Sequence, residues 1–98
     1  MIDGTYTITF DVPFGRKTGT VTLRTEGDTV FADIDAPIVG KQSMQGHVDG
    51  DTFSAQGTGK IKFAGKIDYD LQGKVSGDDL HIEIHSNKGD FTLEGTRN

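Results

Sequence analysis

Apolar and polar residues alternate along most of the chain with a period of two. The first such stretch places Tyr6, Ile8, Phe10 and Val12 on one face and separates them with threonines and an aspartate. This alternation is typical of a β-strand with one buried face, whereas an amphipathic helix repeats its apolar positions every three or four residues. No segment shows the helical repeat. The pattern therefore predicts an all-β protein.

Seven further stretches show the same alternation. Their predicted inward residues are Val21 and Leu23; Val30, Ala32 and Ile34; Met44, Gly46 and Val48; Phe53, Ala55 and Gly57; Ile67, Tyr69, Leu71, Gly73 and Val75; Leu80, Ile82 and Ile84; and Phe91 and Leu93. Gly-Asp pairs at 27–28, 50–51 and 77–78 predict tight hairpin turns, because glycine tolerates the positive φ that two-residue turns require. We expect longer connections over 13–18, 36–41, 58–65 and 86–89.

Eight short antiparallel strands in chain order form either an up-and-down β-barrel or a two-sheet β-sandwich. The barrel is favoured because closure removes exposed edges. A length of 98 residues, 33% of them hydrophobic, supports one core, so we expect a single barrel domain over 1–98. A barrel of eight strands is wide enough to be filled by its own side chains or to hold one small ligand. In so short a chain the filled interior is favoured.

Composition excludes several classes of protein. The chain has no cysteine, which excludes disulfide scaffolds, thiolate metal sites and cysteine nucleophiles. Its net charge of −5 argues against a general nucleic-acid binder. The first residues are neither basic nor apolar, so no signal peptide is visible and a cytoplasmic protein is expected, without a membrane partner.

The two ends of the chain carry a family resemblance. Gly4-Thr5-Tyr6 opens the first predicted strand, and Arg97 follows the last one. This resembles the calycin pattern of lipocalins and fatty-acid-binding proteins, in which a G-x-W motif packs under an arginine from beyond the final strand. Here tyrosine replaces the tryptophan. The resemblance implies a β-barrel with Arg97 over the Tyr6 ring, a favourable cation–π contact, and implies binding of a small hydrophobic molecule.

A meander places its connections alternately at opposite ends of the barrel, and this separates the charges. The basic residues in or beside the longer connections are Arg16, Lys17, Lys41, Lys60, Lys62, Lys66 and Lys88. The acidic residues in or beside the tight turns are Glu26, Asp28, Asp49, Asp51, Asp78 and Asp79. We therefore expect one basic end and one acidic end.

The basic end also holds apolar residues that fit no strand, among them Phe14, Ile38 and Phe63. Apolar groups ringed by ammonium groups would suit a small molecule with a hydrophobic body and an anionic group. The predicted ligand-binding residues are Phe14, Lys17, Ile38, Lys41, Phe63, Lys66 and Tyr69. Two alternatives remain open: the apolar residues form a lid over a filled barrel, or the same end is a contact surface for another protein or for a homodimer.

Catalytic and metal chemistry find little support in the pattern. The carboxylates and histidines of the predicted strands fall on the outward face, which leaves Tyr6 and Tyr69 as the clear polar groups inside. No catalytic residue, cofactor or metal is predicted, and a cofactor-free barrel cyclase or isomerase is the remaining enzymatic alternative. The segment His81-Ile82-Glu83-Ile84-His85 offers three metal-ligand types, but its two histidines would lie about 13 Å apart on one strand, too far to share an ion.

Overall fold

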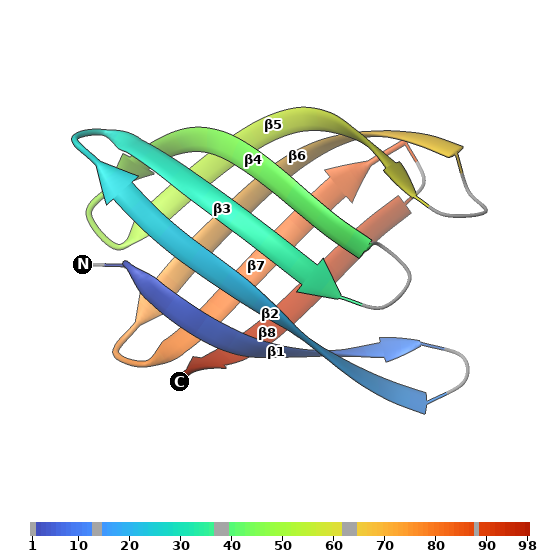
Figure 1. Cartoon of the computed structure of the whole chain (residues 1–98), viewed down its shortest axis with the longest axis horizontal. Coiled ribbons are helices and arrows are strands. Elements are labelled where there is room, and N and C mark those ends of the chain that lie inside the picture. Colours follow the sequence, from blue (N-terminus) through green and yellow to red (C-terminus); the bar gives the residue numbers. More distant parts are fainter. Residues whose placement is uncertain (1, 13–14, 37–39, 62–64, 88) are drawn as a thin grey trace.

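The computed structural model describes residues 2–12, 15–36, 40–61, 65–87 and 89–98. It contains eight strands: β1 (Gly4–Val12), β2 (Gly15–Glu26), β3 (Thr29–Ala36), β4 (Gly40–Asp49), β5 (Thr52–Ile61), β6 (Gly65–Ser76), β7 (Asp79–Ser86) and β8 (Gly89–Arg97). Each strand pairs antiparallel with its neighbours in sequence, and β1 pairs with β8 to close the barrel (Figure 1). The predicted all-β, up-and-down barrel of eight strands is confirmed, and the sandwich alternative is wrong.

Two-residue turns join β2 to β3, β4 to β5 and β6 to β7, as the Gly-Asp pairs predict. The first residue of each turn, Gly27, Gly50 or Gly77, has a φ of 60°, 63° or 63°. Both chain ends lie on the same side of the molecule as these turns (Figure 1). We call this side the turn end. The opposite side, where β2, β4, β6 and β8 begin, is the loop end.

The strands reach further toward the loop end than expected. Residues 15–18, 40–41 and 58–61 belong to strands, although the pattern assigned them to connections. Their inward positions hold residues such as Gly59, which pairs with Ile67, so apolar alternation is weak there. Backbone pairing continues nevertheless, because a ladder of N–H and C=O groups needs no apolar side chain.

Inward side chains fill the barrel most completely at the turn end, and on β3 the buried positions continue to Ile34 and Ala36 near the loop end. The buried cluster consists of Ile2, Tyr6, Ile8, Val21, Leu23, Val30, Ala32, Ile34, Ala36, Phe53, Leu71, Val75, Leu80 and Ile82. Tyr6 and Ile8 at its centre are completely inaccessible to solvent. Burial of this apolar surface is the main term that stabilises the fold.

Two of the eight ladders stop before they reach the loop end. β1 and β8 pair only through Tyr6–Thr9 and Glu94–Arg97, and β4 and β5 pair only through Gly46–Asp49 and Thr52–Ala55. Beyond these pairs β1 and β8 diverge (Figure 1). Toward the loop end the barrel thus continues as two four-stranded sheets, β1–β4 and β5–β8. We call the unpaired lengths the β1/β8 seam and the β4/β5 seam.

Glycines lie where the two seams begin. A Cβ on Gly46 would lie 2.7 Å from the Cβ of Ala55, and a Cβ on Gly95 would lie 2.8 Å from Cγ2 of Ile8. Both distances are shorter than packed carbon atoms tolerate. The paired strands β4 and β5, and β1 and β8, therefore approach each other at these glycines more closely than a larger residue would permit.

Candidate functional site

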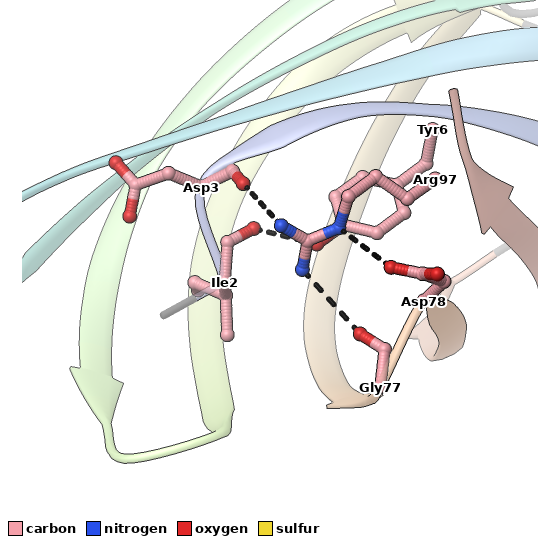
Figure 2. A network of polar contacts seen from close by, with 6 residues as sticks. All are labelled: Ile2, Asp3, Tyr6, Gly77, Asp78 and Arg97. Carbon is pink, nitrogen blue, oxygen red and sulfur yellow. Dashed lines mark hydrogen bonds and ion pairs between the residues drawn. The ribbon is translucent and has the colours of Figure 1, made fainter.

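A network around Arg97 closes the turn end. Its guanidinium lies 5.2 Å from the centroid of the Tyr6 ring, the contact that the family resemblance implies. Nη1 donates a hydrogen bond of 3.0 Å to the Asp3 carbonyl and Nη2 one of 3.5 Å to the Gly77 carbonyl, while Nε lies 3.5 Å from Oδ1 of Asp78 (Figure 2). Arg97 thus joins both ends of the chain to the β6–β7 turn.

The side chain of Tyr6, which lies against Arg97, is also held in place at the turn end. The Tyr6 hydroxyl donates a hydrogen bond of 2.7 Å to the Ile2 carbonyl, and burial raises the pKa of this phenol. Nearby, the amide and the hydroxyl of Thr25 donate to the Asp3 carboxylate at 2.9 and 2.7 Å, which lowers the pKa of Asp3. The Tyr6 hydroxyl and the Asp3 carboxylate are thus both hydrogen-bonded in the packed turn end, and Tyr6 is a structural residue.

The loop end presents a different inner surface. Beyond the paired lengths of the seams, some inward positions are buried, among them Ala32, Ile34, Ala36 and Ile67. Others are partly or largely exposed: Lys17, Gln42, Met44, Gly57, Gly59, Tyr69, Ile84, Phe91 and Leu93. We call this set the loop-end inner face. Phe91 pairs with Ile84, which packs against the core, and yet Phe91 is 46% exposed. The β1/β8 seam explains this exposure, because no strand is paired with β8 on that side of Phe91.

Tyr69 contributes a hydrogen-bond donor to the loop-end inner face. Its ring lies over Gly57 of β5, so that a Cβ on this glycine would lie 2.6 Å from the phenolic oxygen. The hydroxyl makes no hydrogen bond within the part of the chain that the structure describes. Burial raises the pKa of Tyr69, so the phenol keeps its proton at neutral pH. Tyr69 can therefore donate to an acceptor on a bound molecule.

Gln42 brings a second polar group to the same face. Its side-chain oxygen lies 2.7 Å from the position that a Cβ on Gly59 would occupy, which means that this β4 side chain reaches across the β4/β5 seam to β5. Gly57 and Gly59 are successive inward positions of β5, about 7 Å apart along the strand. Sequence reasoning missed Gln42, although it lies in phase with Met44 and could have been assigned to the inner face.

The structure brings two of the predicted site residues to the inner face. Tyr69 is one. Lys17 is the other: it lies two residues before Gly19, which pairs with the buried Ile8, and so it occupies an inward position near the start of β2. Its side chain is exposed.

Lys41 and Lys66 are also exposed at the loop end, but on the outer wall. Lys41 pairs with Asp35, and Lys66 pairs with Lys60. These positions alternate with inward ones, so neither ammonium group starts from the inner face. Three further predicted residues, Phe14, Ile38 and Phe63, lie outside the described residues.

The outer wall carries most of the ionisable side chains of the described strands, and two of its histidines form cross-strand pairs. Nδ1 of His81 lies 2.8 Å from Glu94 and Nε2 lies 3.6 Å from Glu83, and the hydrogen bond to Glu94 is the main reason why the pKa of His81 is raised. His85 pairs with Asp90 at 3.2 Å. Within the described residues, no group of three or more such side chains is arranged to hold a metal ion.

The outer wall has two further features that resemble binding surfaces. A shallow groove of about 390 Å³ crosses β4 to β7 and is lined mainly by polar side chains, among them His47, Gln72 and Lys74. Phe31, which the pattern places outside, is covered by the Arg24 guanidinium at 4.4 Å from the ring centroid. The groove lies on the outer wall and Phe31 is already covered, whereas the loop-end inner face contains both the exposed Phe91 and the Tyr69 hydroxyl, which has no hydrogen-bond partner among the described residues.

Within the described residues, no helix is long and apolar enough to span a membrane.

Comparisons with known proteins support the fold. No family model matches the chain, and no curated protein matches it. A solved structure described as a redesigned β-barrel is similar, with a TM-score of 0.68 and 14% sequence identity over 99% of this chain and 91% of that chain. This likeness shows that the chain has the fold of a closed β-barrel.

Proposed function

We propose that the protein binds a small, partly hydrophobic anion at the loop-end inner face. The observation that carries this proposal is the exposure of Phe91, which is 46% accessible at an inward position of the barrel. Exposed apolar surface on a concave face, accompanied by a few polar groups, is typical of a small-molecule site.

Each residue of this face has a definite part in the proposed binding. Phe91, Leu93 and Met44 contact the hydrophobic body of the ligand. The Tyr69 hydroxyl donates a hydrogen bond to an acceptor on the ligand, because it has no partner among the described residues. The Lys17 ammonium group attracts the anionic group and keeps it close to solvent. Since this chemistry requires no bond to break, the proposed role is binding and not catalysis.

The family resemblance supports the same role. We propose that the chain is a small calycin-like barrel, in which the contact between Arg97 and Tyr6 closes the base and leaves the opposite end for the ligand. The acidic turn end also favours an anion site at the opposite end of the barrel. Its six carboxylates at Glu26, Asp28, Asp49, Asp51, Asp78 and Asp79 are exposed and repel an anion, whereas Lys17, Lys41 and Lys66 lie at the loop end.

Titration with dodecanoate and with a fluorescent anilinonaphthalene sulfonate tests the proposal. Both should bind saturably and compete with each other. Lys17→Glu should weaken the binding about tenfold, since it replaces an attraction with a repulsion. Tyr69→Phe should weaken it several-fold through the lost hydrogen bond.

Lys74→Glu is the matched control, because it makes the same change of charge on the outer wall near the turn end. Its affinity should stay within about twofold of the wild type. Lys41→Glu and Lys66→Glu should have smaller effects than Lys17→Glu, since both begin on the outer wall. Equal effects of Lys17→Glu and Lys74→Glu, or no saturable binding, would contradict the proposal.

A further inference from the structure

The β1/β8 seam leaves backbone hydrogen-bonding groups of β8 without a strand beside them. The amide of Arg97 donates to the Asp78 carbonyl at 2.7 Å on the β7 side, and the amide of Asn98 donates to the Thr5 carbonyl at 2.8 Å on the β1 side. Amide directions alternate along an antiparallel strand, so even-numbered residues of β8 point toward β1. Beyond Glu94, where the pairing with β1 ends, the N–H and C=O groups of Asp90 and Thr92 therefore point into the seam.

A second copy of the same edge can satisfy these groups. If two β8 edges pair antiparallel about Phe91, Asp90 of each copy faces Thr92 of the other. The backbone N–H and C=O groups of Asp90 and Thr92 are the ones that point into the seam, so the arrangement forms four hydrogen bonds between the two copies. Phe91 then faces its counterpart at a position without hydrogen bonds, where side chains on opposite strands approach most closely.

The acidic side chains of β8 favour this register over the registers shifted by two residues. A shift by two residues in one direction would place Asp90 opposite Asp90 of the other copy, with two carboxylates in direct opposition. A shift in the other direction would place Asp90 opposite Glu94. Like charges directly opposite each other destabilise a strand pair. In the register centred on Phe91, Asp90 meets a neutral threonine and keeps its own His85 as an ionic partner at 3.2 Å.

We propose that the protein forms a symmetric homodimer by pairing β8 with β8 through Asp90, Phe91 and Thr92. The dimer covers Phe91, which is 46% exposed in the single chain, and satisfies the unpaired edge. The β4/β5 seam is a poorer interface because the Gln42 side chain already reaches across it to Gly59. The contact is short, so the dimer is weak and depends on protein concentration. The dimer and the proposed ligand both use Phe91, but the dimer rests on the unpaired backbone of β8 and requires no ligand.

Sedimentation velocity over a range of concentrations tests the dimer, with Thr92→Pro as the main variant. Proline removes the Thr92 amide that points into the seam, while the bonds between β8 and β7 do not use this amide. We expect dimerisation to weaken at least about tenfold. Ser43→Pro is the matched control. The amide of Val48 donates to the Asp28 carbonyl, in the turn that precedes β3. Odd-numbered amides of β4 therefore point toward β5, so Ser43→Pro changes the other seam. It should leave the dimer intact.

Phe91→Cys gives a second, independent readout. The proposed register brings the two cysteines to a Cα separation of about 4.5 Å, within the range of a disulfide, and the chain has no other cysteine. Mild oxidation should yield a covalent dimer from Phe91→Cys but not from Glu83→Cys on the outer wall of β7.

A chain that remains monomeric at high concentration, a dimer that is unaffected by Thr92→Pro, or equal crosslinking of the two cysteine variants would overturn the proposal. Monomers whose edge instead takes up an unrelated extended peptide would overturn it too. Thr92 lies on the outer face of β8, so Thr92→Pro keeps the side chains of the proposed ligand site and should bind dodecanoate at least as tightly as the wild type. Loss of the dimer and failure of the proposed ligand site are therefore distinguishable.

Discussion

At the scale of single residues, Arg97 closes the turn end through simultaneous contacts with Asp3, Tyr6 and Asp78. We expect Arg97→Met to lower the free energy of unfolding by about 1–3 kcal/mol, because it removes a hydrogen bond to the Asp3 carbonyl and the cation–π contact with Tyr6. Urea denaturation measures this change. Arg24→Met is the control, since Arg24 lies over the ring of Phe31 but is 59% exposed. Equal losses in the two variants would show that Arg97 is not a closing residue.

His81 should make stability depend weakly on pH. The folded protein raises the pKa of His81 above its ordinary value of 6.5, chiefly through the hydrogen bond to Glu94. The resulting stabilisation is fully present below pH 6.5 and is lost as the pH rises through the folded pKa. His81→Gln should therefore destabilise the protein more at about pH 5.5 than at about pH 8.5, though modestly, because the pair is half exposed.

The imidazole can be followed directly. Titration by NMR should report a pKa for His81 above the ordinary value in the wild type, and Glu94→Gln should bring it down. A midpoint for His81 that does not respond to Glu94→Gln would contradict the assignment of this ion pair.

At the scale of strands, the pairing of β4 with β5 depends on Gly46. Gly46→Ala introduces a Cβ that would lie 2.7 Å from the Cβ of Ala55 and would meet the Ser54 backbone, so we expect a loss of about 1–3 kcal/mol in unfolding free energy. In Gly59→Ala the new Cβ meets the end of the flexible Gln42 side chain, 2.7 Å away, and this can move. Urea denaturation of both variants tests the idea, which fails if Gly59→Ala is the more destabilised.

Strand number, strand order and tight turns could be predicted because each leaves a local signal. Period-two alternation identifies the faces of a strand, and the Gly-Asp pairs identify the turns. The extra strand length at the loop end could not be predicted, because inward positions such as Gly59 break the alternation. The seams were also beyond prediction. Alternation shows which face of β8 is buried but does not show where its pairing with β1 ends.

The candidate site could be predicted only in part for the same reason. Tyr69 falls in phase with the apolar residues of β6, so its inward position followed from the pattern. Lys41 and Lys66 were assigned by their position near predicted connections, which says nothing about the face of a strand. Register places both on the outer wall. Phe91 was assigned to the interior correctly, but its exposure depends on a neighbour that is distant in sequence, β1.

At the scale of the whole molecule, the two ends of the barrel should differ in local stability. The turn end contains most of the buried cluster and the complete ladders, whereas the loop end is divided by two seams. Amide hydrogen exchange should therefore be faster for Ser43 and Thr92, which point into the seams, than for Val48 and Asn98, which bond to backbone carbonyls. NMR-detected exchange measures all four. Uniform protection would contradict a barrel that opens from one end.

The division between a packed turn end and a partly unpaired loop end bears on how such a barrel can change over generations. Residues of the buried cluster and residues of the loop-end inner face are different sets, although Met44, Tyr69, Ile84 and Leu93 of the inner face pack against the cluster. Substitutions on the loop-end inner face remove fewer fully buried contacts, so the preference for the proposed ligand can change while the scaffold persists. A library randomised at Met44, Tyr69 and Phe91 should accordingly retain folded members far more often than one randomised at Tyr6, Leu23 and Leu71.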